Sequence, residues 1–203
     1  MKIFISSILM LAICIAGAQF SYAQELPDAG DRTFEVTVAP FDGSPVSFGE
    51  FRLRSFQSTD SAFRLRADVD YESRRTGENQ RRSRLMLEVA PGIEWHAFQY
   101  DRLSVYYGAE LGLRYRTSRD QISADITNRN NNPAGFFGVD LNALAGLDLH
   151  FLQRLYTGVE VGYGIRFTNY LDQEINDQDV EVNRRDLDIG TFAQPRFRLG
   201  FRF

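Results

Sequence analysis

The sequence predicts an all-β protein, an eight-stranded antiparallel transmembrane up-and-down β-barrel. Three observations lead to this fold class: strict alternation of apolar side chains, opposite faces that mix both charge signs, and alternating short and long connections. The alternation is clearest in residues 85–115, where the segments 85–97 and 103–115 flank a short polar break, Q-Y-D-R. Apolar residues at every second position have the period of a strand and not of a helix. This stretch is therefore predicted to be a long β-hairpin.

The first 23 residues have the form of a secretory signal peptide. Lys2 precedes an apolar run over residues 3–18, and the triplet S-Y-A before residue 24 has the small-x-small pattern that signal peptidase accepts. A membrane anchor helix is the alternative, but it needs about 20 apolar residues. Cys14, the only cysteine, lies within this segment. The mature chain is therefore expected to leave the cytoplasm and to contain no disulfide.

The mature chain is interpreted as a short periplasmic N-terminal tail, residues 24–31, followed by the outer-membrane β-barrel, residues 32–203. The predicted strands, in order, are residues 33–41, 46–56, 62–72, 85–97, 103–115, 136–151, 155–168 and 186–203. A D-G-S-P turn follows the first strand. Connections after the second, fourth and sixth strands are short, whereas residues 73–82, 117–135 and 169–185 form long polar loops. This pattern predicts short turns in the periplasm and long loops outside the cell.

Nearly every predicted strand has one uncharged face and one charged face. A soluble sandwich or ligand-binding barrel would need an apolar core and a polar exterior, so the uncharged face is assigned to lipid and the charged face to the lumen. The charged residues assigned to the lumen are Arg52, Arg54, Arg64, Arg66, Arg84, Arg114, Arg116, Arg166, Arg196, Arg198 and Arg202, with Glu35, Glu50, Asp68, Asp70, Glu88, Glu94, Glu110, Asp140, Asp148, Glu160 and Asp188. The two signs are equal in number, as a buried ion-pair network requires. Eight strands leave an interior just wide enough for side chains, so the sequence predicts a filled lumen.

The predicted hairpin also carries a family resemblance. Residues 90–113, APGIEWHAFQYDRLSVYYGAELGL, resemble the outer-membrane β-barrel domain proteins of the OmpA-like kind, in which a PGIE strand, a D-R-L-S turn and a Y-x-G-A-E-L strand recur. The C-terminal R-L-G-F-R-F looks like the signal that the barrel-assembly machinery recognises, and this assembly signal would comprise Phe197, Leu199, Phe201 and Phe203. The resemblance implies the small eight-stranded fold and the outer membrane of a Gram-negative bacterium.

Few residues suggest chemistry. The only histidines, His96 and His150, fall on lumen faces near short turns, and Ser104 is the nearest serine in the hairpin. Nothing marks that serine as a nucleophile, so the histidines are expected to complete a hydrogen-bond network. We expect no catalytic site, cofactor, metal ion or nucleic-acid partner. The aromatic residues at strand ends are expected to form interfacial girdles; they are Trp95, Phe98, Tyr100, Phe151, Tyr156, Phe201 and Phe203.

The expected partners are outer-membrane lipid, lipopolysaccharide and, during biogenesis, the barrel-assembly machinery. Four arginines around the second long loop, Arg74, Arg75, Arg81 and Arg82, could bind lipopolysaccharide phosphates by charge-assisted hydrogen bonds. The favoured role is structural support or surface interaction through the extracellular loops. A narrow channel is the first alternative, followed by a soluble ligand-binding barrel and an enzyme that depends on His96. Pro91 cannot donate to a β-ladder, so a local bulge or missing bond is predicted at Pro91-Gly92.

Overall fold

The computed structural model describes residues 26–38, 50–77, 80–121, 126–131, 133–176 and 178–203. Most of these residues lie in β-strands. The predicted signal peptide and the D-G-S-P turn lie outside the described residues. The strands are β1 (Arg32–Val38), β2 (Glu50–Ser58), β3 (Ser61–Gly77), β4 (Gln80–Tyr100), β5 (Leu103–Gln121), β6 (Thr127–Arg129), β7 (Phe136–His150), β8 (Leu155–Tyr170), β9 (Gln173–Ile175), β10 (Gln178–Val180) and β11 (Arg185–Arg202). Among the described residues, no helix is long and apolar enough to cross a membrane.

Eight of these strands form a closed antiparallel ring. Its order is β5-β4-β3-β2-β1-β11-β8-β7, and a further pairing of β7 with β5 closes it. β1 joins the first and last parts of the chain because it pairs with both β2 and β11. The fold class predicted from the alternation is therefore confirmed, with all eight strands in up-and-down order.

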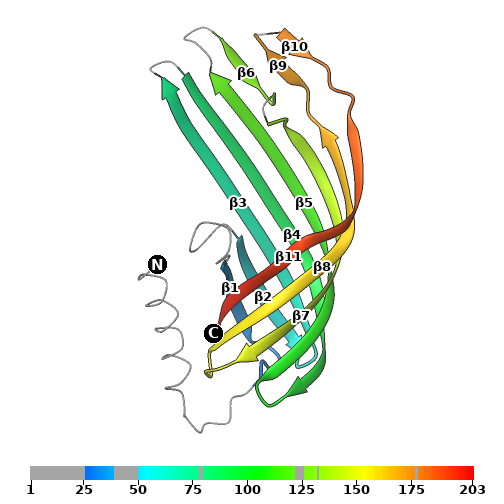
Figure 1. Ribbon diagram of the computed structural model, residues 1–203. Coiled ribbons are helices and arrows are strands. Elements are labelled where there is room, and N and C mark those ends of the chain that lie inside the picture. The colour runs from blue at the N-terminus through cyan, green and yellow to red at the C-terminus, as the bar shows by residue number, and fades with distance from the viewer. Residues whose placement is uncertain (1–25, 39–49, 78–79, 122–125, 132, 177) are drawn as a thin grey trace, which may run out of the picture.

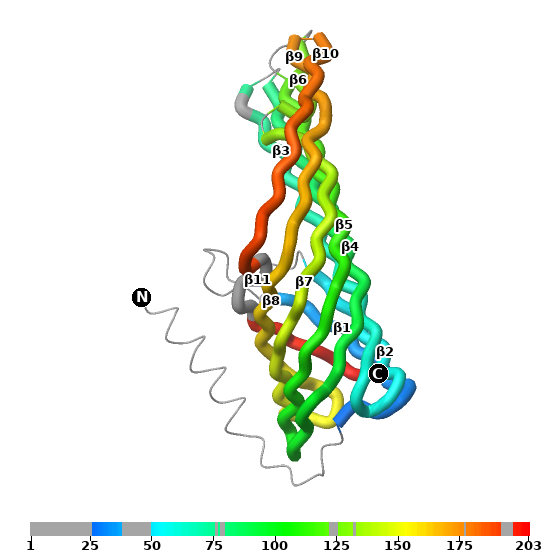
Figure 2. The backbone as a smooth tube through the Cα atoms, turned by 90° about the vertical axis from the view of Figure 1, so that its right-hand side faces the viewer, coloured from blue at the N-terminus to red at the C-terminus, as the bar shows by residue number. Residues whose placement is uncertain are grey.

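The two ends of the ring differ (Figure 1). Short turns connect β2 to β3, β4 to β5 and β7 to β8 at one end, where the C-terminus also lies. At the other end the long strands continue to a small sheet in which β6 pairs with β5 and β9, and β9 pairs with β10. The view turned by 90° shows β6, β9 and β10 together at this far end (Figure 2). We call the two ends the short-turn end and the long-strand end.

The long-strand end contains more strand than the sequence predicts. The sequence predicts a loop over residues 73–82, but β3 and β4 stay paired there, with Ser73 opposite Ser83 and Arg75 opposite Arg81. That expectation is wrong because backbone hydrogen bonds continue beyond the point where apolar alternation stops. The same reason explains why β5 reaches Gln121 and why the two later loops contain β6, β9 and β10.

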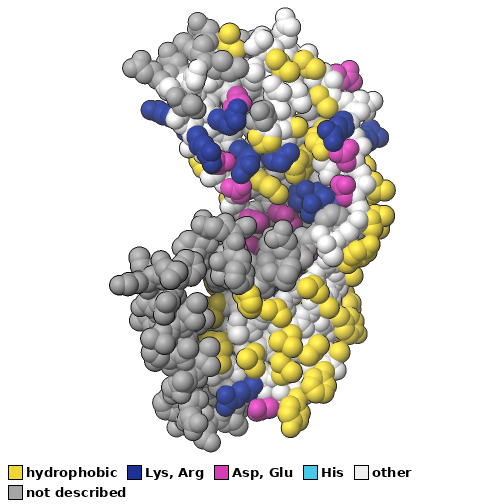
Figure 3. All heavy atoms as spheres, in the orientation of Figure 1, with side chains coloured by type: hydrophobic (Ala, Val, Ile, Leu, Met, Phe, Trp, Pro, Cys, Tyr) yellow, Lys and Arg dark blue, Asp and Glu magenta, His cyan; other side chains and the backbone are white. Residues whose placement is uncertain are grey.

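The apolar side chains face outward and the polar side chains face inward. On β5, outward positions such as Leu111 and Leu113 are exposed, whereas the inward Glu110 and Arg114 are buried. Figure 3 shows hydrophobic side chains over the lower part of one face and most of the charged ones gathered above them. The outward apolar positions of β5 run from Val105 to Tyr115, about 33 Å along the strand. At a tilt of about 40° this corresponds to an apolar band about 25 Å tall, which matches an outer membrane.

Irregular pairing is confined to a few places. At Pro91 the ladder from β4 to β5 is interrupted, because no pairing joins Ala90 or Pro91 to β5, although Val89 and Gly92 are paired in the same register. The predicted missing bond is confirmed there, without a bulge. A register shift between His96 and Phe98 lies nearer the turn. It lets Phe98 face outward although it follows an inward-facing histidine by two positions.

The lumen ion-pair network

Charged side chains from every strand of the ring meet inside it. We call these ten residues the lumen network: Glu35, Arg52, Arg54, Arg64, Arg66, Glu94, Glu110, Asp148, Glu160 and Arg198. Strand alternation explains their meeting, because each occupies an inward position of a strand whose other face carries apolar residues. All are buried except Arg66, which is largely buried.

Glu35 on β1 is the acceptor at one side of the network. It lies 2.9 Å from Arg198 Nη1 and 3.3 Å from Arg52 Nη1, and it also accepts a hydrogen bond from Arg54. Arg54 and Arg198 share a second acid, Asp148 on β7, at 2.7 and 2.9 Å. These contacts join β1, β2, β7 and β11, so the strands of the first and last parts of the chain are tied through the interior.

Glu160 on β8 is the acceptor at the other side. Arg52 Nη2 and Arg64 Nη1 each lie 2.9 Å from its carboxylate. Arg64 also contacts Glu94 at 2.8 Å and Glu110 at 3.2 Å, which adds β4 and β5. Each guanidinium therefore faces more than one carboxylate, the arrangement that offsets the cost of burying charge. The network spans the lumen and reaches all eight strands.

Two tyrosines that are not among the predicted lumen residues complete the network. Tyr106 on β5 donates to Glu160 at 2.5 Å, and Tyr156 on β8 donates to Glu35 at 2.7 Å. The assignment of Tyr156 to the interfacial girdle is wrong, since it is buried inside the ring. The alternation of inward and outward positions along β5 and β8 places both tyrosines on the charged face, so the sequence contains the information that identifies them.

Glycines make room for these two rings. A Cβ on Gly200 would lie 2.1 Å from an atom of the Tyr156 ring, and a Cβ on Gly146 would lie 2.3 Å from atoms of Tyr106. Either distance is far below van der Waals contact, so no larger residue fits without moving a tyrosine. The inward glycines are thus part of how the lumen is filled.

A second group of charges lies nearer the long-strand end. Arg114 and Arg166 both contact Asp140, at 2.8 and 3.4 Å. Arg116 donates to the carbonyl of Ala134, and its guanidinium lies over the ring of Phe136. These side chains are less buried toward the long-strand end.

The remaining predicted lumen residues are distributed around these two groups. Glu88 contacts Arg66 at 2.6 Å, and Glu50 lies 3.6 Å from Arg52. Arg84 pairs with Asp70 at 2.9 Å in an exposed position.

Burial and contacts differ among the other predicted acids and arginines. Asp68 is half-buried, whereas Asp70 and Asp188 are exposed although they share the inward face. Arg202 lies at the short-turn mouth, where it binds Asp31 and the carbonyl of Leu26 rather than the network. The N-terminal tail is therefore held against the ring. The side chain of Arg196 lies outside the described part of the structure.

The histidines lie between the network and the short turns. His96 Nδ1 is 2.7 Å from Ser104 Oγ, and His96 Nε2 is 3.8 Å from Glu94. This sequence of hydroxyl, imidazole and carboxylate resembles the order of a catalytic triad, but Ser104 is only 1% exposed. His150 packs on the Tyr156 ring, with centroids 5.0 Å apart. The hydroxyl is buried inside the ring, and the contacts of both histidines are those of a hydrogen-bonded and packed interior.

The four arginines of the β3–β4 hairpin are exposed and divide by face. Arg74 and Arg82 have the inward parity and contact Glu72 and Asp120, respectively. Arg75 and Arg81 have the outward parity and lie opposite each other across the hairpin.

A closed ring of antiparallel strands with an apolar exterior and buried charged side chains inside defines an outer-membrane β-barrel protein. Comparison with known sequences gives the family. The chain belongs to the "Putative OmpA-OmpF-like porin family", whose family model matches residues 78–203. No curated protein matches the sequence significantly.

Three solved structures show a weak likeness to this chain. Ail, the attachment invasion locus protein of Yersinia pestis, is 12% identical to this chain with a TM-score of 0.45. The match covers 86% of this chain and 99% of the Ail chain. The N-terminal β-barrel domain of OprF from Pseudomonas aeruginosa has 14% identity and a TM-score of 0.44, covering 87% of this chain and 100% of its own. OprG from the same organism has 16% identity and a TM-score of 0.40, covering 87% and 97%. At these values the family match, and not the likeness to solved structures, carries the assignment.

Proposed function

We propose that this protein is a non-enzymatic component of the cell envelope whose barrel is closed to solutes and whose long-strand end acts at the cell surface. A cleaved signal peptide delivers it, and the short-turn end faces the periplasm. The outward Phe197, Leu199 and Phe201 of β11, together with Phe203 directly after it, serve as the assembly signal. The observation that supports a closed barrel is the lumen network, which joins all eight strands through buried ion pairs. A water path through the lumen network would have to break these buried ion pairs.

Solute flux tests the closed lumen against the alternative of a narrow channel. Purified protein is placed in liposomes, and the entry of potassium chloride and of a monosaccharide is measured by swelling. We expect the wild type to match protein-free liposomes. The double variant Arg198→Ala with Tyr106→Ala removes two side chains that cross the lumen, and we expect it to admit ions. Ion entry through the wild type at the rate of this variant would contradict the proposal.

The surface role rests on the outward pair of arginines in the β3–β4 hairpin. Arg75 and Arg81 lie directly opposite each other, and like charges in this position repel. They lie four residues beyond Tyr71 and Leu85 on the same outward faces, about 13 Å along the strands from the end of the apolar band. A phosphate between the two guanidiniums would relieve the repulsion through charge-assisted hydrogen bonds. We therefore assign the lipopolysaccharide contact to Arg75 and Arg81.

Matched double variants test this assignment. Arg75→Gln with Arg81→Gln should weaken binding of lipopolysaccharide about tenfold in a surface plasmon resonance measurement, because two charge-assisted contacts are lost. Arg74→Gln with Arg82→Gln removes the same charge from the inward face, where acidic partners already occupy the side chains, and should change binding little. Equal losses in both double variants would show that net charge, and not this pair, governs the interaction.

A further inference from the structure

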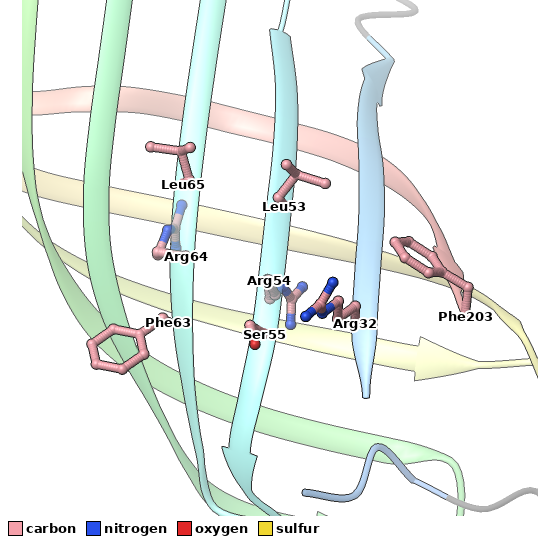
Figure 4. A pocket seen from close by; sticks show the side chains of 8 residues that line it. All are labelled: Arg32, Leu53, Arg54, Ser55, Phe63, Arg64, Leu65 and Phe203. Atoms are coloured by element: carbon pink, nitrogen blue, oxygen red, sulfur yellow. The ribbon is translucent and has the colours of Figure 1, made fainter. Parts of the chain in front are cut away.

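The outer wall has a hollow near the short-turn end that contains an arginine. Its volume is about 390 Å³, and its lining residues include Arg32 on β1, Ser55 on β2 and Phe63 on β3. Figure 4 shows the Arg32 side chain reaching from β1 toward β2, with Leu53 and Leu65 above it and Phe203 on its other side. A cation on the apolar wall of a membrane barrel is costly unless it reaches the interface or binds an anion.

Strand parity places this hollow on the outside of the barrel. Thr33 and Glu35 are buried on the inward face of β1, so Arg32 shares the outward face with Phe34. Ser55 pairs with both Arg32 and Phe63 in the ring. A serine at an outward position between larger neighbours leaves space in the wall, and this space is the hollow.

The Arg32 side chain has no ion pair or side-chain hydrogen bond within the described residues. Its backbone is paired, because its N–H donates to Phe203 O and its carbonyl accepts from Phe203 N. The neighbouring acid, Asp31, is bound to Arg202 at 3.2 Å. The exposed guanidinium therefore lines the hollow with its donors available.

Apolar residues lie on the side of Arg32 that faces the membrane centre. Leu53 and Leu65 pair with each other on the same outward face, two residues farther from the short-turn end than Ser55 and Phe63. Arg32 and the Ser55 hydroxyl therefore lie at one level near the short-turn end, and the apolar pair lies nearer the membrane centre. A glycerophospholipid has the same order of groups, with phosphate at the interface and acyl chain inside.

We propose that this hollow is a binding site for one glycerophospholipid of the periplasmic leaflet. Arg32 donates to the phosphate, the Ser55 hydroxyl donates a further hydrogen bond, and an acyl chain lies over Leu53 and Leu65. The leaflet follows from the proposed orientation, with the short turns in the periplasm. The site differs from the lipopolysaccharide contact in position, since Arg75 and Arg81 lie at the opposite end of β3 and β4.

Native mass spectrometry of the detergent-solubilised full chain tests the site, with dioleoyl phosphatidylglycerol as the probe. Arg32→Gln should weaken the first binding event about fivefold, the effect of one arginine near a lipid surface, and Arg32→Lys should restore part of it. Ser55→Leu fills the hollow while it keeps the charge, and it should also weaken binding. Arg154→Gln, which removes an exposed arginine of the β7–β8 turn, is the matched control and should bind as the wild type does.

Unchanged binding in Arg32→Gln or in Ser55→Leu would overturn the proposal, as would an equal loss in Arg154→Gln. Replacing the probe by lipid A distinguishes the two lipid sources, because its binding should not depend on Arg32. Heat-modifiable migration of each variant in gels shows separately that the barrel has formed. Protease access to the two ends in intact cells tests the proposed orientation, so a failure there is distinguishable from failure of the binding site.

Discussion

Replacing Glu35 by glutamine tests how strongly the lumen network holds the barrel. The carboxylate is 1% exposed and accepts from Arg52, Arg54 and Arg198, as well as from Tyr156 at 2.7 Å. Glutamine has nearly the same shape and still offers an oxygen to the tyrosine. It removes the charge that three buried guanidiniums face, so the effect measured is electrostatic and not a cavity.

The magnitude follows from what the three arginines retain. Arg54 and Arg198 keep Asp148, at 2.7 and 2.9 Å, and Arg52 keeps Glu160 at 2.9 Å. Removing one partner of a buried pair costs about 3–5 kcal/mol. Because no guanidinium is left without an acid, we expect the lower end, about 3 kcal/mol of the free energy of unfolding.

Urea unfolding in lipid vesicles measures this loss, with the fluorescence of Trp95, the only tryptophan, as the signal. Trp95 faces outward and is 40% exposed in the isolated protein, so unfolding transfers it from lipid to water. The control is Glu174→Gln, which breaks a surface pair with Arg129 at 3.3 Å. It should cost less than about 1 kcal/mol. A Glu35→Gln protein within about 0.5 kcal/mol of the wild type would refute the reasoning.

Three further changes follow from the same geometry. Tyr106→Phe removes a hydroxyl that donates to a buried carboxylate at 2.5 Å and should lower the free energy of unfolding by about 1.5–3 kcal/mol in the same assay. Gly200→Ala should destabilise by about 1–3 kcal/mol or prevent heat-modifiable migration, because its Cβ would overlap the Tyr156 ring. Gly190→Ala meets nothing within 4 Å and is the control; equal effects of the two would contradict the packing argument. Asn128→Ala loses a 2.8 Å bond to the backbone of the β9–β10 turn and should speed proteolysis there, whereas unchanged cleavage would show that the contact does not order it.

The sequence predicts the ring because the period of its apolar residues is set by lipid. From Val105 to Tyr115 every outward position must be apolar or aromatic, so strand, face and register can be inferred from one stretch. Beyond the membrane this constraint disappears. The paired residues Ser73 and Ser83, or Arg75 and Arg81, leave no pattern that distinguishes a ladder from a loop, so the strands predicted from the sequence end too early.

The lumen residues were predictable as a class but not as partners. Parity places Glu35, Arg54 and Asp148 on inward faces, yet their meeting depends on the relative stagger of β1, β2 and β7, which no local pattern determines. Parity also marked Tyr156 as inward. Its aromatic character and its position near a strand end favour the interfacial girdle, but the periodic signal is the stronger of the two.

Single-channel recording in planar bilayers tests the central claim, a lumen filled by an ion-pair network, most directly. The protein is inserted at known density, confirmed by recovery of folded protein from the membrane, and current is recorded at fixed voltage in potassium chloride. The network predicts no discrete conductance steps from the wild type and reproducible steps from Arg198→Ala with Tyr106→Ala. Discrete, reproducible openings of the wild type, unchanged by that double substitution, would contradict the claim.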